Sequence, residues 1–330
     1  MKKVLCCFMG SLLLVCLAVG YGAAAPIELK CISIYPEIHQ SFQCFVMLRD
    51  RVNQRAKGEL VIKHIGGPEA MGPFDQPKAV AKGVIDMAIT FSGSYAGLVP
   101  GENLFSVSQI PFDKERELGF YDLMNEIHNK AGLFFLGRGA AGYGHKEPRK
   151  WHLWVNKKIK RPQDLAGMKI GAISPAMNNF ARALGVAPVV VTATDLHTAL
   201  ERGVVDGQFN PMGSFLALGG MEVCKYYIDL TYATDNNVFI INLATWNRLP
   251  KHLQKLMTEV AIEVERDYPP IEVEFVKKCW EKMRSAGIEF IQFSPTDKDW
   301  FINLFYQAEW KALLEKYPEV ASRAKKMLVR

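Results

Sequence analysis

The sequence predicts an α/β protein built from two similar halves and a mainly helical C-terminal third. Short apolar runs of strand length alternate with stretches of helical period in two successive blocks, and the second block begins near Trp151. Glycines end several predicted helices, as at Gly185 and Gly203. Beyond residue 250, long apolar stripes at helical spacing predominate.

The elements of the two blocks follow from these patterns. In the first block we expect strands at 27–34, 59–65, 85–90 and 133–136, and helices at 39–57, 76–82 and 113–130. In the second we expect a helical turn at 162–165, strands at 168–173, 188–191 and 204–209, and helices at 175–184 and 194–202. Such alternation favours mainly parallel sheets, which bind ligands at the carboxyl ends of their strands.

The C-terminal third is expected to be mostly helical. A helix at 250–266 should be interrupted at Pro269 and Pro270, because proline lacks the N–H that a helix interior needs. A second helix through Met283 ends at Gly287. A strand at 288–293, a long amphipathic helix at 297–316 and a shorter last helix complete the chain.

The N-terminus resembles an export signal. Lys2 and Lys3 precede the apolar stretch 4–19, and small residues at 22–25 supply a cleavage site. We therefore expect residues 1–25 to be a signal peptide that is removed. A membrane anchor is the alternative, but the stretch is shorter than the roughly 20 apolar residues that span a bilayer.

Charge and composition exclude several classes of protein. The formal net charge is +6, and +4 without the two N-terminal lysines, which is a weak bias for a nucleic-acid-binding protein. An apolar content of 49% excludes a disordered chain. The cysteines outside the signal could form two disulfides in three pairings or remain buried thiols; they are Cys31, Cys44, Cys224 and Cys279.

Motifs for cofactor or metal chemistry are weak or absent. Residues 137–142 match GxGxxG, but a polar segment with Pro148 follows where a dinucleotide site needs a helix to begin. A flexible glycine crossover is the better interpretation. The seven histidines form no HExxH or HxH pair, and the expected mature chain has no CxxC. We therefore expect neither a cofactor nor catalysis.

Polar residues follow the ends of predicted strands. The candidates are Ser33, Tyr35 and His39 after the first strand, and Ser92, Ser94 and Tyr95 after the third. In this topology these positions face a ligand; ordinary turn chemistry is the alternative. The aromatic group of Trp151, His152 and Trp154 is either hinge core or a stacking wall for a ligand.

Several motifs together resemble one family. Residues 159–170, IKRPQDLAGMKI, resemble "PI-x-TPEDLKGLKIR", and residues 195–211, DLHTALERGVVDGQFNP, resemble "E-x-Y-x-AL-x-xG-x-xDGQENP". Residues 66–69 and 81–86 resemble a "GG-x-E … G-x-xD" stretch, and residues 246–250 resemble "W-x-xLP". In this order they resemble the DctP-type solute-binding proteins of tripartite ATP-independent periplasmic (TRAP) transporters.

The resemblance implies the two-lobed periplasmic binding protein fold, with hinged lobes and a long C-terminal helix crossing both. It assigns 26–148 to lobe I, with about 237–276 returning to it, and 149–236 with about 277–330 to lobe II. The lobes would close on a small organic ligand in the periplasm and deliver it to membrane subunits of the transporter. A sensor for a signalling receptor and an exported enzyme are the alternatives.

Two substitutions depart from the family pattern. Gly171 stands where "GLKIR" ends in the Arg that holds a ligand carboxylate, and Phe209 replaces the Glu of "DGQEN". These changes suggest a larger, less anionic or aromatic ligand. Arg138, Arg149 or Lys150 could instead supply the positive charge. The further candidate ligand residues are Glu69, Ser174, Asn178, Asn210, Met212, Phe215 and Asn236.

Overall fold

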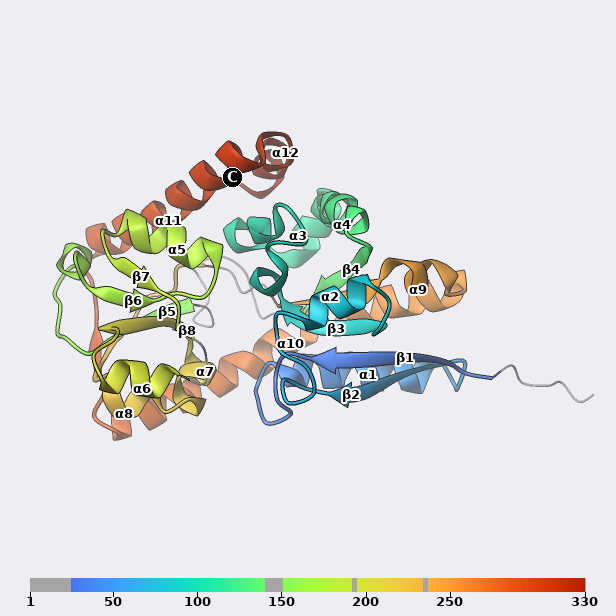
Figure 1. The fold of residues 1–330 in the computed structure, drawn as a ribbon, viewed down its shortest axis with the longest axis horizontal. Coiled ribbons are helices and arrows are strands. Elements are labelled where there is room, and N and C mark those ends of the chain that lie inside the picture. Colours follow the sequence, from blue (N-terminus) through green and yellow to red (C-terminus); the bar gives the residue numbers. More distant parts are fainter. Residues whose placement is uncertain (1–24, 140–150, 192–194, 234–236, 330) are drawn as a thin grey trace, which may run out of the picture.

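Two separate β-sheets organise the molecule, and helices cover their faces (Figure 1). The structure is a computed structural model that describes residues 25–139, 151–191, 195–233 and 237–329. We call the part around the sheet β2-β1-β3-β10-β4 lobe I, and the part around the sheet β11-β9-β5-β8-β6-β7 lobe II. The predicted two-lobed α/β fold is confirmed.

Lobe I contains strands from before and after the segment of the chain that forms most of lobe II. Its strands are β1 (Ile27–Ser33), β2 (Leu60–Gly66), β3 (Met87–Phe91), β4 (Leu133–Arg138) and β10 (Asn237–Asn242). Its helices are α1 (Phe42–Arg55), α2 (Gln76–Ala81), η1 (Ser92–Tyr95), η2 (Glu102–Val107), α3 (Phe112–Glu117), α4 (Phe120–Lys130) and α9 (Leu243–Arg248). The single helix predicted at 113–130 is wrong, because Gly119 takes a left-handed φ of 79° and separates α3 from α4.

Lobe II holds the second sheet. Its strands are β5 (Trp151–Val155), β6 (Lys169–Gly171), β7 (Ala187–Val189), β8 (Gly207–Pro211), β9 (Tyr226–Ile228) and β11 (Glu289–Ile291). Its helices are η3 (Pro162–Leu165), α5 (Pro175–Ala183), α6 (Leu196–Glu201), α7 (Met212–Ala217) and α8 (Gly220–Val223). The short elements α7, α8 and β9 were not expected, since each is too short to show a clear period in the sequence.

Strand direction explains how the chain passes between the lobes. The prediction of mainly parallel sheets is only partly right, because β10 runs antiparallel to β3 and β4, and β5 runs antiparallel to β8 and β9. Each of these two strands is the first that the chain enters after crossing from the other lobe. A strand that enters its sheet at the edge where the neighbours end must run opposite to them. The two crossings, before β5 and before β10, therefore mark the end of each sheet that lies nearest the other lobe.

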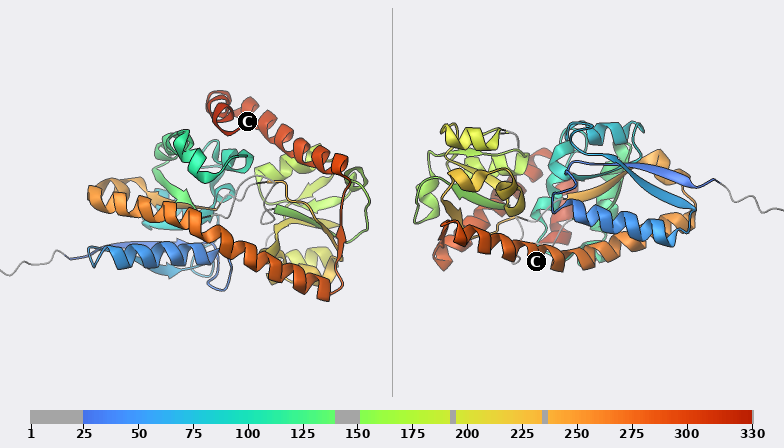
Figure 2. Two further views of the ribbon diagram at one scale, coloured as in Figure 1. Left: turned by 180° about the vertical axis from the view of Figure 1, so that it is seen from behind. Right: turned by 90° about the horizontal axis from the view of Figure 1, so that it is seen from below.

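Three C-terminal helices connect the lobes. Helix α10 (Lys251–Ser285) contacts α1 and β4 in lobe I and α7 in lobe II, as Figure 2 shows. The expected long helix crossing both lobes is confirmed. Helix α11 (Pro295–Lys316) packs on α5, and α12 (Pro318–Leu328) packs on α4.

The predicted interruption at Pro269 and Pro270 is wrong, because α10 continues through both residues. The two prolines leave two helix carbonyls without N–H partners. Pro270 lies on the exposed face of the helix, where water can bond such groups. Buried Tyr268 and Val276 on either side anchor the helix to the two lobes, so tertiary packing overrides the local preference.

Buried apolar clusters lie on both faces of each sheet. Along β3, Met87 and Ile89 face a cluster with α1 and α10, whereas Ala88 faces a cluster with α2 and α4. The second of these clusters continues into lobe II. Cys31, Cys44, Cys224 and Cys279 are free and buried, so the thiol alternative is correct. Among the described residues, no helix combines the length and the apolar character of a membrane span.

We predict that Pro269→Ala combined with Pro270→Ala raises the free energy of unfolding by about 1–3 kcal/mol, because α10 regains two backbone hydrogen bonds. Urea denaturation measures this change. Pro250→Ala is the control, since Pro250 precedes the first turn and interrupts no helical bond; it should change stability by less than about 0.5 kcal/mol. A double variant no more stable than the wild type would contradict the prediction.

Candidate ligand-binding site

The two sheet edges that the crossings mark lie against each other where the lobes meet. In lobe I the ends of β3 and β4 lie beside the start of β10, where Asn237 pairs with Phe91. In lobe II the end of β8 lies beside the start of β5, where Trp151 pairs with Pro211. These edges are in contact: a Cβ added at Gly93 of lobe I would lie 3.2 Å from Cβ of Ser174 in lobe II.

His39 makes a direct hydrogen bond between the lobes. Its Nε2 lies 2.8 Å from Oγ of Ser214 at the start of α7. Its Nδ1 accepts the backbone N–H of Ser41 at 3.1 Å, so Nε2 carries the proton and donates to Ser214. Burial lowers the pKa of His39 to about 4 and keeps the ring neutral at pH 7.

Tyr35 orients His39 and joins the crossing strand. The two rings stack with centroids 4.7 Å apart and planes inclined by 16°. The hydroxyl of Tyr35 donates to Oδ1 of Asn237, the first residue of β10. This chain of contacts runs from Asn237 through Tyr35 and His39 to Ser214, so it ties the start of β10 in lobe I to lobe II.

Amide and hydroxyl groups form the lobe II edge. Ser174 caps α5 by accepting the N–H of Met177 at 3.3 Å, and its carbonyl accepts the side-chain amide of Asn178 at 2.9 Å. The carbonyl oxygen of the Asn178 amide therefore remains as an acceptor. Asn210, at the end of β8, has 9% of its surface exposed, and among the described residues its side chain has no hydrogen-bond partner. These groups are neutral donors and acceptors.

Gln208 fills the space beside Gly171. A Cβ at position 171 would lie 1.4 Å from Oε1 of Gln208 and 2.4 Å from its Cδ. The amide of Gln208 donates to the carbonyl of Phe209 at 3.3 Å, and its Oε1 is buried without a hydrogen-bond partner. A side chain at position 171 would have to displace Gln208, so the glycine and this glutamine conformation depend on each other.

Several predicted ligand residues lie inside a lobe, which corrects the sequence interpretation. Trp154 stacks on Phe215 with centroids 4.1 Å apart, and both are fully buried. Phe209 follows Gln208, the β8 residue that pairs with Trp154, so strand alternation turns Phe209 to the opposite face, where it packs against Phe180 and Tyr232. Three further candidates also lie in lobe cores rather than at the contact between the lobes. Tyr95 is hydrogen-bonded to His128, His152 is hydrogen-bonded to Tyr227, and Met212 is buried. Trp151, 9% exposed, remains at the edge.

The side chain of Arg138 is also buried inside lobe I. In this arrangement it cannot replace the arginine that the family pattern has at position 171. Its guanidinium lies 4.7 Å from the ring centroids of both Phe105 and Phe112 and 3.8 Å from a carboxylate oxygen of Glu115. None of its surface is exposed. Burial raises the pKa of Glu115 to about 7, and the charge of Arg138 opposes this rise.

The predicted serines of lobe I make hydrogen bonds within their own turns. Ser33 Oγ donates to the carbonyl of Tyr35 at 2.8 Å and accepts its N–H at 2.9 Å, while Ser94 Oγ lies 2.6 Å from Oγ1 of Thr90. Ser92 is buried at the start of η1. Glu69 lies beside a cavity of about 380 Å³ near the end of β2, and its Oε1 accepts the N–H of Gly67 at 2.6 Å.

Some predicted residues fall outside the described part of the chain, and others were missed. Asn236, Arg149 and Lys150 lie outside it, as do residues 140–142 of the GxGxxG match. Ser214 was missed, because its bond to His39 spans 175 positions and has no local signal. Within the described residues, no group of three or more His, Cys, Asp or Glu side chains could hold a metal ion.

Comparisons with known proteins agree on one family. Residues 33–316 match the model of "Bacterial extracellular solute-binding protein, family 7" (DctP). The 2,3-diketo-L-gulonate-binding periplasmic protein YiaO of Escherichia coli is 27% identical over 251 residues, which cover 73% of this chain and 74% of that protein.

Solved structures share the fold at lower sequence identity. DctP7 of Bordetella pertussis, an extracytoplasmic solute receptor binding pyroglutamic acid, superposes with a TM-score of 0.77 at 16% identity, covering 92% of this chain and 99% of that one. A TRAP periplasmic solute-binding protein of Haemophilus influenzae with bound L-gulonate gives a TM-score of 0.74 at 19% identity, covering 91% and 98%. These similarities support the two-lobed architecture.

We predict that Gly171→Ala lowers the free energy of unfolding by about 1–3 kcal/mol, because its Cβ displaces Gln208. Urea denaturation measures the loss, and a second substitution, Gln208→Ala, should restore part of it. Gly97→Ala is the matched control, since a Cβ there meets no atom within 4 Å. Equal stability of the Gly171→Ala and Gly97→Ala proteins would show that Gln208 does not occupy this space.

The lowered pKa of His39 predicts a pH-dependent contribution to stability. The neutral ring is favoured in the folded protein, so His39 costs stability as pH falls below its unfolded pKa of about 6.5 towards about 4. Relative to His39→Gln, the wild type should lose about 1–3 kcal/mol between about pH 8 and pH 4.5. Urea denaturation of both proteins at both pH values isolates the contribution of His39, because the other titrating groups contribute equally to the stability of the two proteins. A constant difference between the two proteins would contradict it.

Proposed function

The chain belongs to family 7 of the bacterial extracellular solute-binding proteins, and we propose that it captures one small organic acid between its lobes for a TRAP transporter. In this proposal the protein works in the periplasm after export and passes the solute to the membrane subunits. The solute stabilises the closed lobes, and the closed form is what those subunits receive. The protein binds its solute without converting it.

The observation that carries this proposal is the facing pair of strand edges. Strands β5 and β10 each begin where neighbouring strands end, so the polar loops of both lobes lie at one contact. His39 and Ser214 already join the lobes there at 2.8 Å. Hinged lobes with neutral hydrogen-bonding groups at the contact fit a receptor that closes around a solute.

The ligand-facing groups favour a solute of low charge. Gly171 offers no guanidinium, and Gln208 fills the adjacent space. The described edge residues Asn178 and Asn210 offer amide groups, which bind hydroxyls and single carboxylates through hydrogen bonds. With Trp154, Phe209 and Phe215 in lobe cores, the aromatic part of the ligand hypothesis rests on Trp151. We therefore propose a hydroxylated or cyclic monocarboxylate.

A thermal-shift screen tests the proposal. The panel contains pyroglutamate, L-gulonate and 2,3-diketo-L-gulonate, which related proteins bind, with benzoate as an aromatic acid and malate as a small dicarboxylate. A solute at 100 times its dissociation constant stabilises by about 2.7 kcal/mol, which corresponds to about 4 °C in Tm for a chain of this size. We expect a monocarboxylate to give the largest shift and malate none.

Matched variants locate the binding. Asn210→Ala should remove most of the shift, whereas Asn247→Ala, an exposed residue of α9 in lobe I, should leave it unchanged. Lys150→Met tests the alternative source of charge, and a shift abolished by this variant would assign the carboxylate to Lys150. A shift with malate alone would contradict the ligand class, and release of a chemically altered solute would contradict a binding protein.

A further inference from the structure

The C-terminal helices α11 and α12 form a second connection between the lobes, on the side opposite α10 (Figure 2). The first half of α11 packs on lobe II, where the ring of Phe305 lies 5.4 Å from that of Phe180 on α5. Helix α12 packs on lobe I, where Arg323 donates to both carboxylate oxygens of Glu126 on α4, at 3.1 and 2.8 Å. Any separation of the lobes must therefore act on this segment.

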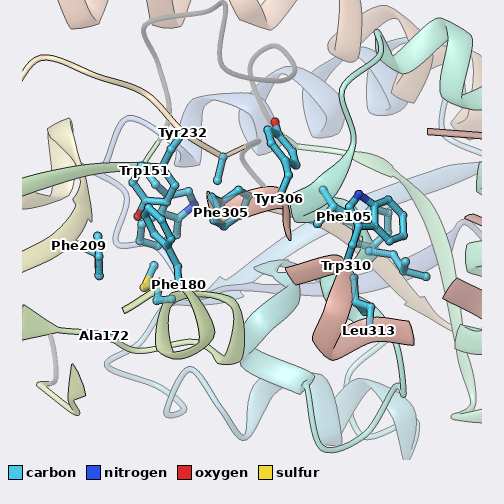
Figure 3. Close-up of a cluster of buried hydrophobic side chains, with 14 of the residues drawn as sticks. Phe105, Trp151, Ala172, Phe180, Phe209, Tyr232, Phe305, Tyr306, Trp310 and Leu313 are labelled. Carbon is cyan, nitrogen blue, oxygen red and sulfur yellow. The ribbon is translucent and has the colours of Figure 1, made fainter. Parts of the chain in front are cut away.

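Aromatic side chains of α11 fill the space between the lobes. Figure 3 shows Phe305, Tyr306 and Trp310 between Phe180 of lobe II and Phe105 of lobe I. These residues belong to one buried apolar cluster that spans both lobes. Water is thus excluded from the centre of the connection.

A carboxyl group lies within this apolar surrounding. Glu309 of α11 has no exposed surface, and its Oε2 accepts the side-chain amide of Asn103 from η2 in lobe I at 3.0 Å. Its Oε1 is buried without a hydrogen-bond partner. Since α11 packs on α5 of lobe II, the bond between Glu309 and Asn103 joins the lobes, and moving α11 with lobe II breaks it.

A second buried carboxyl group lies on the lobe I side. Glu102 of η2 is 2% exposed, and its Oε1 is buried without a hydrogen-bond partner. Burial raises the pKa of Glu102 to about 8 and that of Glu309 to about 7, and a charge on Glu309 adds to the rise at Glu102. The other ionisable groups that act on Glu102 are Lys316, which lowers its pKa, and the hydroxyl of Tyr95.

We propose that Glu102 and Glu309 form a proton-dependent latch between the lobes, which holds them closed when protonated and releases them when ionised. The proposal rests on the hinged closure of the proposed function and adds its regulation. An ionised carboxylate gains hydration when the lobes separate, whereas a protonated carboxyl group gains little. Closing therefore takes up protons, and the ratio of open to closed molecules rises with pH.

The direction of the pH effect on closure, and its pH range, follow from the pKa values of the two glutamates in the closed and open states. In the open state both carboxyl groups should return towards their usual pKa near 4.5, so closure is weakened as pH rises above that value and the effect is complete above about pH 8. His39 acts in the opposite direction, but only below about pH 6.5, where its ring can protonate in the open state. Between about pH 6.5 and 8.5 the two glutamates dominate.

Distance measurements between spin labels test the latch without any added solute. Exposed Lys82 of lobe I and Lys160 of lobe II are replaced by cysteine and labelled, since the described native cysteines are buried. We expect the open-to-closed ratio to rise about tenfold or more between about pH 6.5 and 8.5. Glu102→Gln with Glu309→Gln should stay mostly closed and change less than about twofold, since glutamine still accepts a hydrogen bond and cannot ionise.

Two further variants serve as controls for the latch. Glu315→Gln, an exposed residue on the same helix, should keep the wild-type pH dependence. Asn103→Ala removes the lobe I amide and should raise the open fraction at every pH. A variant with both glutamates replaced that keeps the wild-type dependence, or a wild type without any dependence, would overturn the latch. If a solute from the thermal-shift panel still closes the lobes, only the latch fails; if neither pH nor any solute changes the distance, the hinged closure fails with it.

Discussion

The apolar connection that α11 makes between the two sheets is the interaction on which the rest of the structure depends. Phe105 of lobe I, Trp310 of α11 and Phe180 of lobe II belong to one buried cluster, so the lobes share a core rather than a linker alone (Figure 3). Apolar contact has no preferred direction, which lets the lobes adjust against each other. Polar contacts, those of His39 with Ser214 and of Glu309 with Asn103, then decide which arrangement is favoured.

Much of the fold was predictable because it rests on local patterns. Strands β1 to β4 of lobe I and most helices of both blocks follow from apolar periodicity and from glycines that end helices, whereas β10 was missed. The errors have a common cause, since local preference lost to tertiary packing or to one backbone angle. Helix α10 passes through Pro269 and Pro270 because both halves are anchored, and Gly119 splits one predicted helix into two. Reversal of β5 and β10 depends on the order of crossings, which periodicity does not encode.

The candidate site was less predictable, because strand alternation decides which residues reach the contact between the lobes. Motif position drew attention to Gly171, but the side chain that fills its place is Gln208, one strand away. Aromatic residues beside the motif, Trp154 and Phe209, point to opposite faces of the sheet and enter two different cores. Long-range partners such as Ser214 have no signal near His39 in the sequence.

The central claim is that two lobes close on one small organic acid. The most direct measurement is mass spectrometry of the small molecules that the purified protein releases on denaturation. The account predicts about one equivalent of a single hydroxylated or cyclic monocarboxylate per chain, which Asn210→Ala protein should release in much smaller amount. Release of a nucleotide or a metal instead, or of equal amounts of acid from both proteins, would contradict it.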